Sequence, residues 1–313
     1  MSTAILFPGQ GSQHVGLGLQ LARAYPEAAR TFEEADDILG FALSRLCWEG
    51  PEDELVLTQN AQPAILTHSV AVFRIVGEAV GRISHAAGHS LGEYSAHVAA
   101  GTLSFSDAVA GVRLRGQLMF GASTKRAGTM AAVIGLSDDE LIAVCEAASG
   151  GGRICVPANF NCPGQVVISG DREGVDEGMR LASEAGARRV VPLSVSGAFH
   201  SPLMAPAAKG LRAKLNDLNF GDPHFPVVSN VTTGPVTDGD TARELLVDQL
   251  TSPVRWAGSM REMLSAGVDR FIEMGPGSVL CGLSRRNARG VPCQAVGEPD
   301  DIDALLSEES EHA

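Results

Sequence analysis

Apolar residues recur along the chain at two spacings, and together they predict a repeated strand–turn–helix order. The short apolar run at 4–7 and the segment 83–87 each lead into a glycine-containing turn, which is typical of strands. Helical spacing of apolar residues covers 17–46 and 64–80, and Pro63 stands near the first turn of the second stretch. This rhythm predicts an α/β protein with a mainly parallel sheet.

The middle of the chain predicts a second, smaller unit. Its strands and helices follow each other in the order β-α-β-β-α-β, which is the order of a ferredoxin-like unit. We therefore expect a small subdomain at 127–194, inserted into a large subdomain formed by 1–126 and 195–313. The expected strands are 129–134, 154–159, 165–169 and 189–193, and the expected helices are 138–148 and 175–185.

Composition and charge narrow the class of protein. The chain has 313 residues, of which 44% are hydrophobic and 19% are charged, as in ordinary globular proteins. No apolar run approaches the roughly 18 residues of a membrane-spanning helix, and the N-terminus lacks the basic segment of a secretory signal. We therefore expect a cytoplasmic protein that does not bind membranes. A net charge of −13 argues against a nucleic-acid partner, because phosphate contacts need a concentrated basic face.

The six cysteines are scattered and form no C-x-x-C pair. In a cytosolic chain this pattern indicates buried free thiols, so we expect neither disulfides nor a metal site. Gly9-x-Gly11 after the first strand resembles the start of a dinucleotide fingerprint, but its third glycine would fall on His14. No P-loop sequence occurs either, and we expect no resident cofactor.

The strongest chemical signal is the sequence GHSLG at 88–92, a G-x-S-x-G motif between an expected strand and an expected helix. In this setting the serine, Ser90, sits on a sharp turn with its hydroxyl exposed. The backbone N–H of Leu91 points to where an oxyanion would form, and the helix beginning there adds its positive end. The motif therefore predicts that Ser90 is a nucleophile.

A serine hydroxyl needs an adjacent base, and eight histidines compete for that role. His89 is next to Ser90 in the chain and should point away from it at the turn, so we expect a structural role. His200 stands out because it lies in a loop of small residues directly after the expected small subdomain. From the residues alone, a hydrogen-bonded structural histidine explains His200 as well as a base does.

Five motifs follow one another along the chain: FPGQGSQ at 7–13, GHSLGEYSA at 88–96, Arg115-Gly116, NFN at 159–161 and GPG at 275–277. In this order they resemble the malonyl-CoA:acyl carrier protein transacylases, the acyltransferases of fatty-acid synthesis and polyketide assembly. The resemblance extends from about residue 4 to about residue 290. It implies an α/β-hydrolase-like large subdomain with an inserted ferredoxin-like small subdomain, in agreement with the pattern above.

Carried over residue by residue, the resemblance implies the parts of an acyl-transfer site. Ser90 would be the nucleophile and His200 its base. The backbone N–H groups of Gln10 and Leu91 would form the oxyanion hole. Arg115 would grip the free carboxylate of malonate, with a planar fork that lysine lacks. Without its ligand the buried guanidinium is expected to be unsatisfied, so uncharged acyl groups such as acetyl should be rejected.

Two further positions complete the implied site. Gln249 matches the position whose backbone carbonyl orients the histidine, which fixes the imidazole tautomer without adding a charge. Phe199 stands where a phenylalanine accompanies malonyl selection in related polyketide acyltransferases. Its ring would crowd a substituent at the α-carbon, where one methyl group is worth about 1–3 kcal/mol.

The implied reaction moves a malonyl group from coenzyme A to the phosphopantetheine thiol of an acyl carrier protein, by a ping-pong mechanism through an acyl-serine. Malonyl-CoA and an acyl carrier protein are then the partners, the carrier brings the phosphopantetheine, and we expect a monomer. Two alternatives stay open: an editing hydrolase that acts on carrier-protein thioesters, and a transferase for another acyl unit. The intact set of Ser90, His200 and Arg115 argues against a non-catalytic docking protein.

Overall fold

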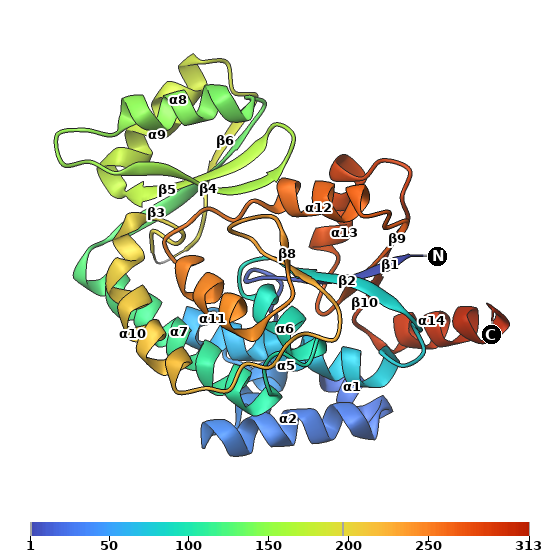
Figure 1. Ribbon diagram of the computed structural model, residues 1–313. Coiled ribbons are helices and arrows are strands. Elements are labelled where there is room, and N and C mark those ends of the chain that lie inside the picture. Colours follow the sequence, from blue (N-terminus) through green and yellow to red (C-terminus); the bar gives the residue numbers. More distant parts are fainter. Residues whose placement is uncertain (1, 196, 313) are drawn as a thin grey trace.

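Two sheets organise the computed structural model, which describes residues 2–195 and 197–312 (Figure 1). Met1, Ser196 and Ala313 lie outside the described residues. The larger sheet has six strands in the order β10-β9-β1-β2-β7-β8, all parallel except the last, which is antiparallel to β7. These strands are β1 (Thr3–Phe7), β2 (Ile83–Gly88), β7 (Val227–Val228), β8 (Pro235–Val236), β9 (Arg270–Met274) and β10 (Cys293–Val296).

Helices bury both faces of this sheet. Along β1, Ile5 and Phe7 belong to a core formed with α5, α6 and α14, whereas Ala4 and Leu6 belong to a core formed with α12 and α13. Burial on both faces explains why residues 4–7 of β1 form an unbroken apolar run in the sequence. The helices are α1 (Leu19–Ala24), α2 (Pro26–Leu39), α5 (Thr58–Val76), α6 (Gly92–Ala99), α12 (Trp256–Ser265), α13 (Val279–Asn287) and α14 (Pro299–His312).

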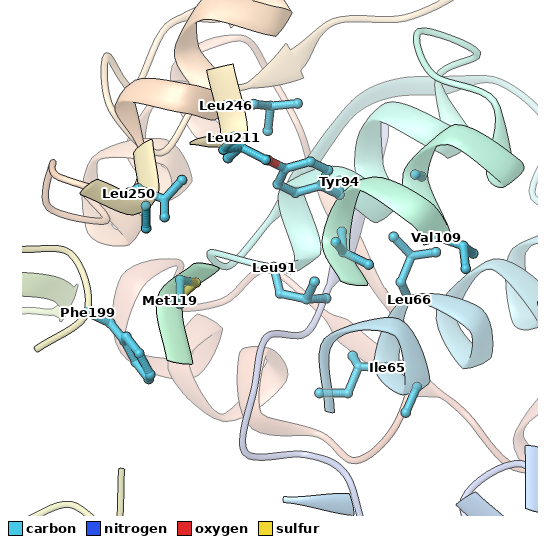
Figure 2. Close-up of a cluster of buried hydrophobic side chains, with 14 of the residues drawn as sticks. Ile65, Leu66, Leu91, Tyr94, Val109, Met119, Phe199, Leu211, Leu246 and Leu250 are labelled. Carbon is cyan, nitrogen blue, oxygen red and sulfur yellow. The ribbon is translucent and has the colours of Figure 1, made fainter. Parts of the chain in front are cut away.

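A third core lies beside the sheet and supports the turn that carries Ser90. Figure 2 shows Leu91 and Tyr94 among side chains of α5, α7, α10 and α11, in a cluster that also includes Met119 and Phe199. Because Leu91 and Tyr94 are fully buried here, the start of α6 has little freedom to move. The remaining helices of the large unit are α3 (Leu43–Glu49), α4 (Glu52–Leu55), α7 (Phe105–Lys125), α10 (Ala205–Asn216), α11 (Gly239–Asp248) and the short 3₁₀ helix η1 (Pro202–Met204).

The smaller sheet has four antiparallel strands in the order β4-β5-β3-β6, and it forms one end of the molecule together with α8 and α9 (Figure 1). The chain order of these elements is the expected β-α-β-β-α-β. All of them lie within 127–194, although the exact limits of a subdomain stay a prediction. They are β3 (Gly128–Ile134), α8 (Asp138–Ala148), β4 (Cys155–Cys162), β5 (Gln165–Asp171), α9 (Arg172–Glu184) and β6 (Arg189–Pro192).

Two helical stretches differ from the sequence prediction. The stretch 17–46 is divided among α1, α2 and α3, because Pro26 starts a new helix and Gly40 ends it in a left-handed conformation. Helix α5 begins at Thr58 and not after Pro63, so the proline lies inside it. The Gln59 carbonyl, which Pro63 cannot bond, instead accepts a hydrogen bond from Arg113 Nη1 at 2.6 Å.

The expectation of six free thiols is wrong for one pair. Cys281 on α13 and Cys293 at the start of β10 form a disulfide, with Cα atoms 5.3 Å apart. The chain returns from α13 directly to the neighbouring strand, which brings the two residues within bridging distance. The other four cysteines are free and buried. Within the described part of the chain, no helix is both long and apolar enough to span a bilayer.

Candidate active site

Ser90 occupies a sharp turn between β2 and α6. Its φ of 51° lies in the left-handed region, which is costly for a serine. The turn needs glycine on both sides: a Cβ on Gly88 would lie 1.9 Å from the Gly92 carbonyl carbon, and one on Gly92 would lie 2.1 Å from the Phe7 carbonyl oxygen. The G-x-S-x-G spacing is therefore a steric requirement of this strand–turn–helix connection.

Asn230, two residues after β7, holds this turn. Its Oδ1 accepts a hydrogen bond from the Ser90 N–H at 2.7 Å, and its Nδ2 donates to the Gly88 carbonyl at 2.7 Å. Sequence reasoning missed Asn230. The available signal was its place just after β7, because polar residues that follow parallel strands gather at one edge of the sheet.

His200 lies beside the serine hydroxyl, as the sequence analysis expected of the base. Its Nε2 is 2.8 Å from Ser90 Oγ, and its Nδ1 is 2.9 Å from the Gln249 carbonyl oxygen. A carbonyl can only accept, so Nδ1 carries the proton and Nε2 is free to accept the serine proton. Burial lowers the pKa of His200 to about 3, with a further lowering by the Arg115 charge. The imidazole is therefore neutral at neutral pH.

Arg115 lies on α7, almost fully buried at 1% exposure, and faces the same hydroxyl. Its Nη2 is 3.2 Å from Ser90 Oγ and donates to Gln249 Oε1 at 2.8 Å, while Nη1 donates to Gln62 Oε1 at 2.7 Å. The expectation that this guanidinium is unsatisfied without a ligand is therefore wrong for both terminal nitrogens, because two amide oxygens serve them. Only its Nε lacks a partner among the described residues.

Gln249 connects the parts of the site. Its backbone carbonyl meets His200, its side-chain oxygen meets Arg115, and its Nε2 donates both to the Ser90 carbonyl at 3.0 Å and to Glu93 Oε2. Sequence reasoning expected only the backbone contact. The side-chain amide cannot rotate without losing bonds at both ends, so its orientation is fixed by its neighbours.

Glu93, in the first turn of α6, is a buried carboxyl that sequence reasoning also missed. Burial raises its pKa to about 7, against the opposing effects of the Gln249 hydrogen bond and the Arg115 charge. Its position in the GHSLGE sequence was visible, but its burial depends on the packing of α6 against the rest of the site. The Gln249 side-chain amide therefore lies between Glu93 and Arg115, and it also binds the Ser90 carbonyl.

The remaining predicted residues gather around one cavity of about 230 Å³. Phe199 and Met119 form part of its wall, and both also belong to the core in Figure 2. His89 contacts Asn161 Oδ1 through Nε2 at 2.9 Å and packs against Trp256, as expected of a structural histidine. The cavity lies between the two sheets, and the predicted residues that line it are Gln10, Ser90, Leu91, Arg115, Phe199 and His200.

The arrangement has the chemical parts of an acyl-transfer site. A neutral imidazole accepts from a serine hydroxyl, and a fixed carbonyl orients that imidazole. Among the described residues, neither the Gln10 nor the Leu91 N–H donates to a protein acceptor, so both are available for an oxyanion. A guanidinium beside the hydroxyl can bind an anionic group of the substrate.

Comparison with known proteins identifies the family. The acyl transferase domain family matches residues 5–305. A malonyl CoA-acyl carrier protein transacylase from Bacillus subtilis is 46% identical to this chain, over 99% of this chain and 99% of its own length. The Escherichia coli transacylase is 44% identical to this chain, over 97% of this chain and 98% of its own length.

Solved structures agree with this assignment. An acyl carrier protein S-malonyltransferase from Vibrio cholerae superposes with a TM-score of 0.94 at 43% identity, covering 97% of this chain and 100% of its own. A malonyl-transacylase in complex with a type II PKS acyl-carrier protein superposes with a TM-score of 0.95 at 42% identity. This match covers 98% of this chain and 100% of its own. The chain therefore belongs to the malonyl CoA-acyl carrier protein transacylase family.

Proposed function

We propose that this chain transfers a malonyl group from coenzyme A to the phosphopantetheine thiol of an acyl carrier protein. The family membership supports the reaction class, the thioester donor and the carrier partner. The observation that carries the chemical assignment is the meeting of His200 Nε2 and Arg115 Nη2 at one oxygen, Ser90 Oγ, at 2.8 and 3.2 Å.

In the first half-reaction Ser90 Oγ attacks the thioester carbonyl of malonyl-CoA, and its proton passes to His200 Nε2. The N–H groups of Gln10 and Leu91 stabilise the tetrahedral oxyanion, a contribution of about 10²–10³ in rate per donor. The intermediate collapses to malonyl-Ser90, and the departing sulfur of coenzyme A takes the proton from His200. Proton transfer by such a base increases the rate by a factor of about 10²–10⁴.

The second half-reaction reverses these roles with a different thiol. His200 accepts the proton of the carrier's phosphopantetheine thiol, and the sulfur attacks the carbonyl of malonyl-Ser90. Collapse breaks the bond to Ser90 Oγ, which takes its proton back from His200. Throughout, Arg115 holds the free carboxylate of the malonyl group by paired hydrogen bonds.

Phe199 supplies selectivity at the α-carbon in this proposal. Its side chain is buried and lines the cavity that contains the serine and the arginine. A substituent on the α-carbon would have to displace part of this packed wall, which favours malonyl over methylmalonyl groups.

A transfer assay tests the proposed function directly. The protein is mixed with malonyl-, methylmalonyl- or acetyl-CoA and a carrier protein bearing phosphopantetheine, and the carrier is weighed by mass spectrometry. We expect malonyl-carrier as the main product, with little free malonate. Release of free malonate in place of malonyl-carrier would support the hydrolase alternative, and preferential loading of another acyl group would contradict the malonyl assignment.

A further inference from the structure

A continuous chain of hydrogen bonds joins Arg115 to Gln10. Arg115 Nη1 donates to Gln62 Oε1 at 2.7 Å, Gln62 Nε2 donates to Thr58 Oγ1 at 2.8 Å, and Thr58 Oγ1 donates to Gln10 Oε1 at 2.8 Å. The first residue of this chain is the proposed carboxylate clamp, and the last carries a proposed oxyanion N–H. We call these four residues the relay.

The polarity of the relay is fixed at every link. An arginine can only donate, so the Gln62 oxygen faces Arg115 and the Gln62 nitrogen faces Thr58. The Thr58 hydroxyl accepts from that nitrogen, and its single proton is then directed to Gln10. Gln62 and Thr58 are at most 1% exposed, so water cannot replace either bond.

The packing of α7 against α5 keeps the relay in place. Gly116 follows Arg115, and a Cβ there would lie 2.5 Å from Gln59 Cα and 2.7 Å from the Thr58 carbonyl oxygen. The two backbones are therefore in direct contact at the level of the relay. At the other end, Gln10 is exposed in a loop where Gly11 has a φ of 109°. The bond from Thr58 anchors that loop to the helix pair.

We infer that the relay sets the spacing between the carboxylate clamp and the oxyanion hole, so that carboxyacyl selection is expressed in the rate of Ser90 acylation. This inference rests on the proposed function. A malonyl group has a carboxylate at one end and a thioester carbonyl at the other, and Arg115 and Gln10 would hold these two ends. A fixed distance between Arg115 and the Gln10 N–H favours an acyl group whose carboxylate and thioester carbonyl can bind both groups at the same time.

Thr58→Val tests the relay, because it removes the hydroxyl while nearly preserving side-chain shape and leaves the groups proposed to touch substrate unchanged. We expect kcat for malonyl-enzyme formation to fall about tenfold, with little change in KM, because a displaced oxyanion donor affects the transition state most. Thr58→Ser keeps the hydroxyl and should restore the rate. Thr67→Val is the matched control: Thr67 is buried on the same helix, and its hydroxyl has no partner among the described residues.

A double-mutant cycle with Arg115→Ala gives the decisive readout. If the relay couples the two sites, Thr58→Val costs about tenfold in the parent but less than about threefold in the Arg115→Ala background, where the carboxylate is no longer held. Equal costs in both backgrounds would overturn the inference. Gln10→Ala removes the last hydrogen bond of the relay at an exposed position. If Thr58→Val does not fold, the double-mutant cycle of Gln10→Ala with Arg115→Ala tests the coupling instead. Failure of the parent protein to form malonyl-enzyme would contradict the proposed function, whereas an additive cycle with an active parent contradicts only the relay.

Discussion

His200 Nε2 lies 2.8 Å from Ser90 Oγ, although 110 positions separate the two residues in the chain. Ser90 comes from the turn after β2, and His200 from the segment that follows the smaller sheet. Both have positive φ angles, 51° and 57°, so each is held in a conformation that neither residue adopts readily. Strain at two facing residues is consistent with a site that the surrounding fold holds in position.

Arg115→Ala should separate recognition of the carboxylate from acyl transfer itself. We expect malonyl loading to fall between about 10- and 100-fold, because a charge-assisted interaction is lost. Acetyl loading should fall less or increase, since acetyl has no carboxylate to hold. Single-turnover loading with malonyl-CoA and acetyl-CoA measures both. Arg212→Ala, at an exposed position on α10, is the control. Equal losses for both substrates would contradict the role of Arg115 as a carboxylate clamp.

The pH dependence of substrate binding should follow Glu93. Its pKa is raised to about 7 by burial, so the carboxyl loses its proton as the pH rises through that value. Its new negative charge then competes with the malonyl carboxylate for Arg115, and we expect KM for malonyl-CoA to increase. Steady-state kinetics between about pH 6 and pH 8 check this, with acetyl-CoA, whose acyl group carries no charge, as the control.

Glu93→Gln should remove this increase in KM. Folding raises the Glu93 pKa above its ordinary value of 4.5, so the associated stability is present below pH 4.5 and is lost as the pH rises through about 7. The same variant should therefore flatten the pH dependence of the melting temperature over that range. A KM that does not change with pH in the parent protein would contradict the assignment.

Phe199→Ala should widen the choice of acyl unit. Removing the ring opens space beside the α-carbon, and we expect the malonyl-to-methylmalonyl ratio of kcat/KM to fall by about 10- to 100-fold. Competition between the two thioesters, scored by the mass added to the protein, measures this ratio. An unchanged ratio would place selectivity elsewhere in the cavity wall.

The sequence predicted the parts of the site that depend on local backbone geometry. Gly88, Ser90 and Gly92 specify a turn whose steric needs can be inferred from the residue types. Asn230 and Glu93 were missed because their roles arise from contacts across strands and helices. The side chain of Gln249 was missed for the same reason, although the role of its backbone carbonyl followed from the family resemblance.

Helix boundaries and cysteine pairing show the same limit. Pro63 lies inside α5, where it cannot donate to the Gln59 carbonyl. Arg113, 50 residues later, donates a hydrogen bond to that carbonyl in its place. Cys281 and Cys293 pair because the chain returns from α13 to β10, which packs next to that helix. Both features depend on where distant segments meet, which apolar periodicity does not reveal.

The most direct test of the central claim is to locate the acyl group on the protein. After brief mixing with malonyl-CoA, proteolysis and mass spectrometry should find the malonyl group on the peptide that contains Ser90. Ser90→Ala should carry none, and His200→Ala should load more slowly by about 10²–10⁴. A malonyl group on another residue, or undiminished loading of Ser90→Ala, would contradict the account.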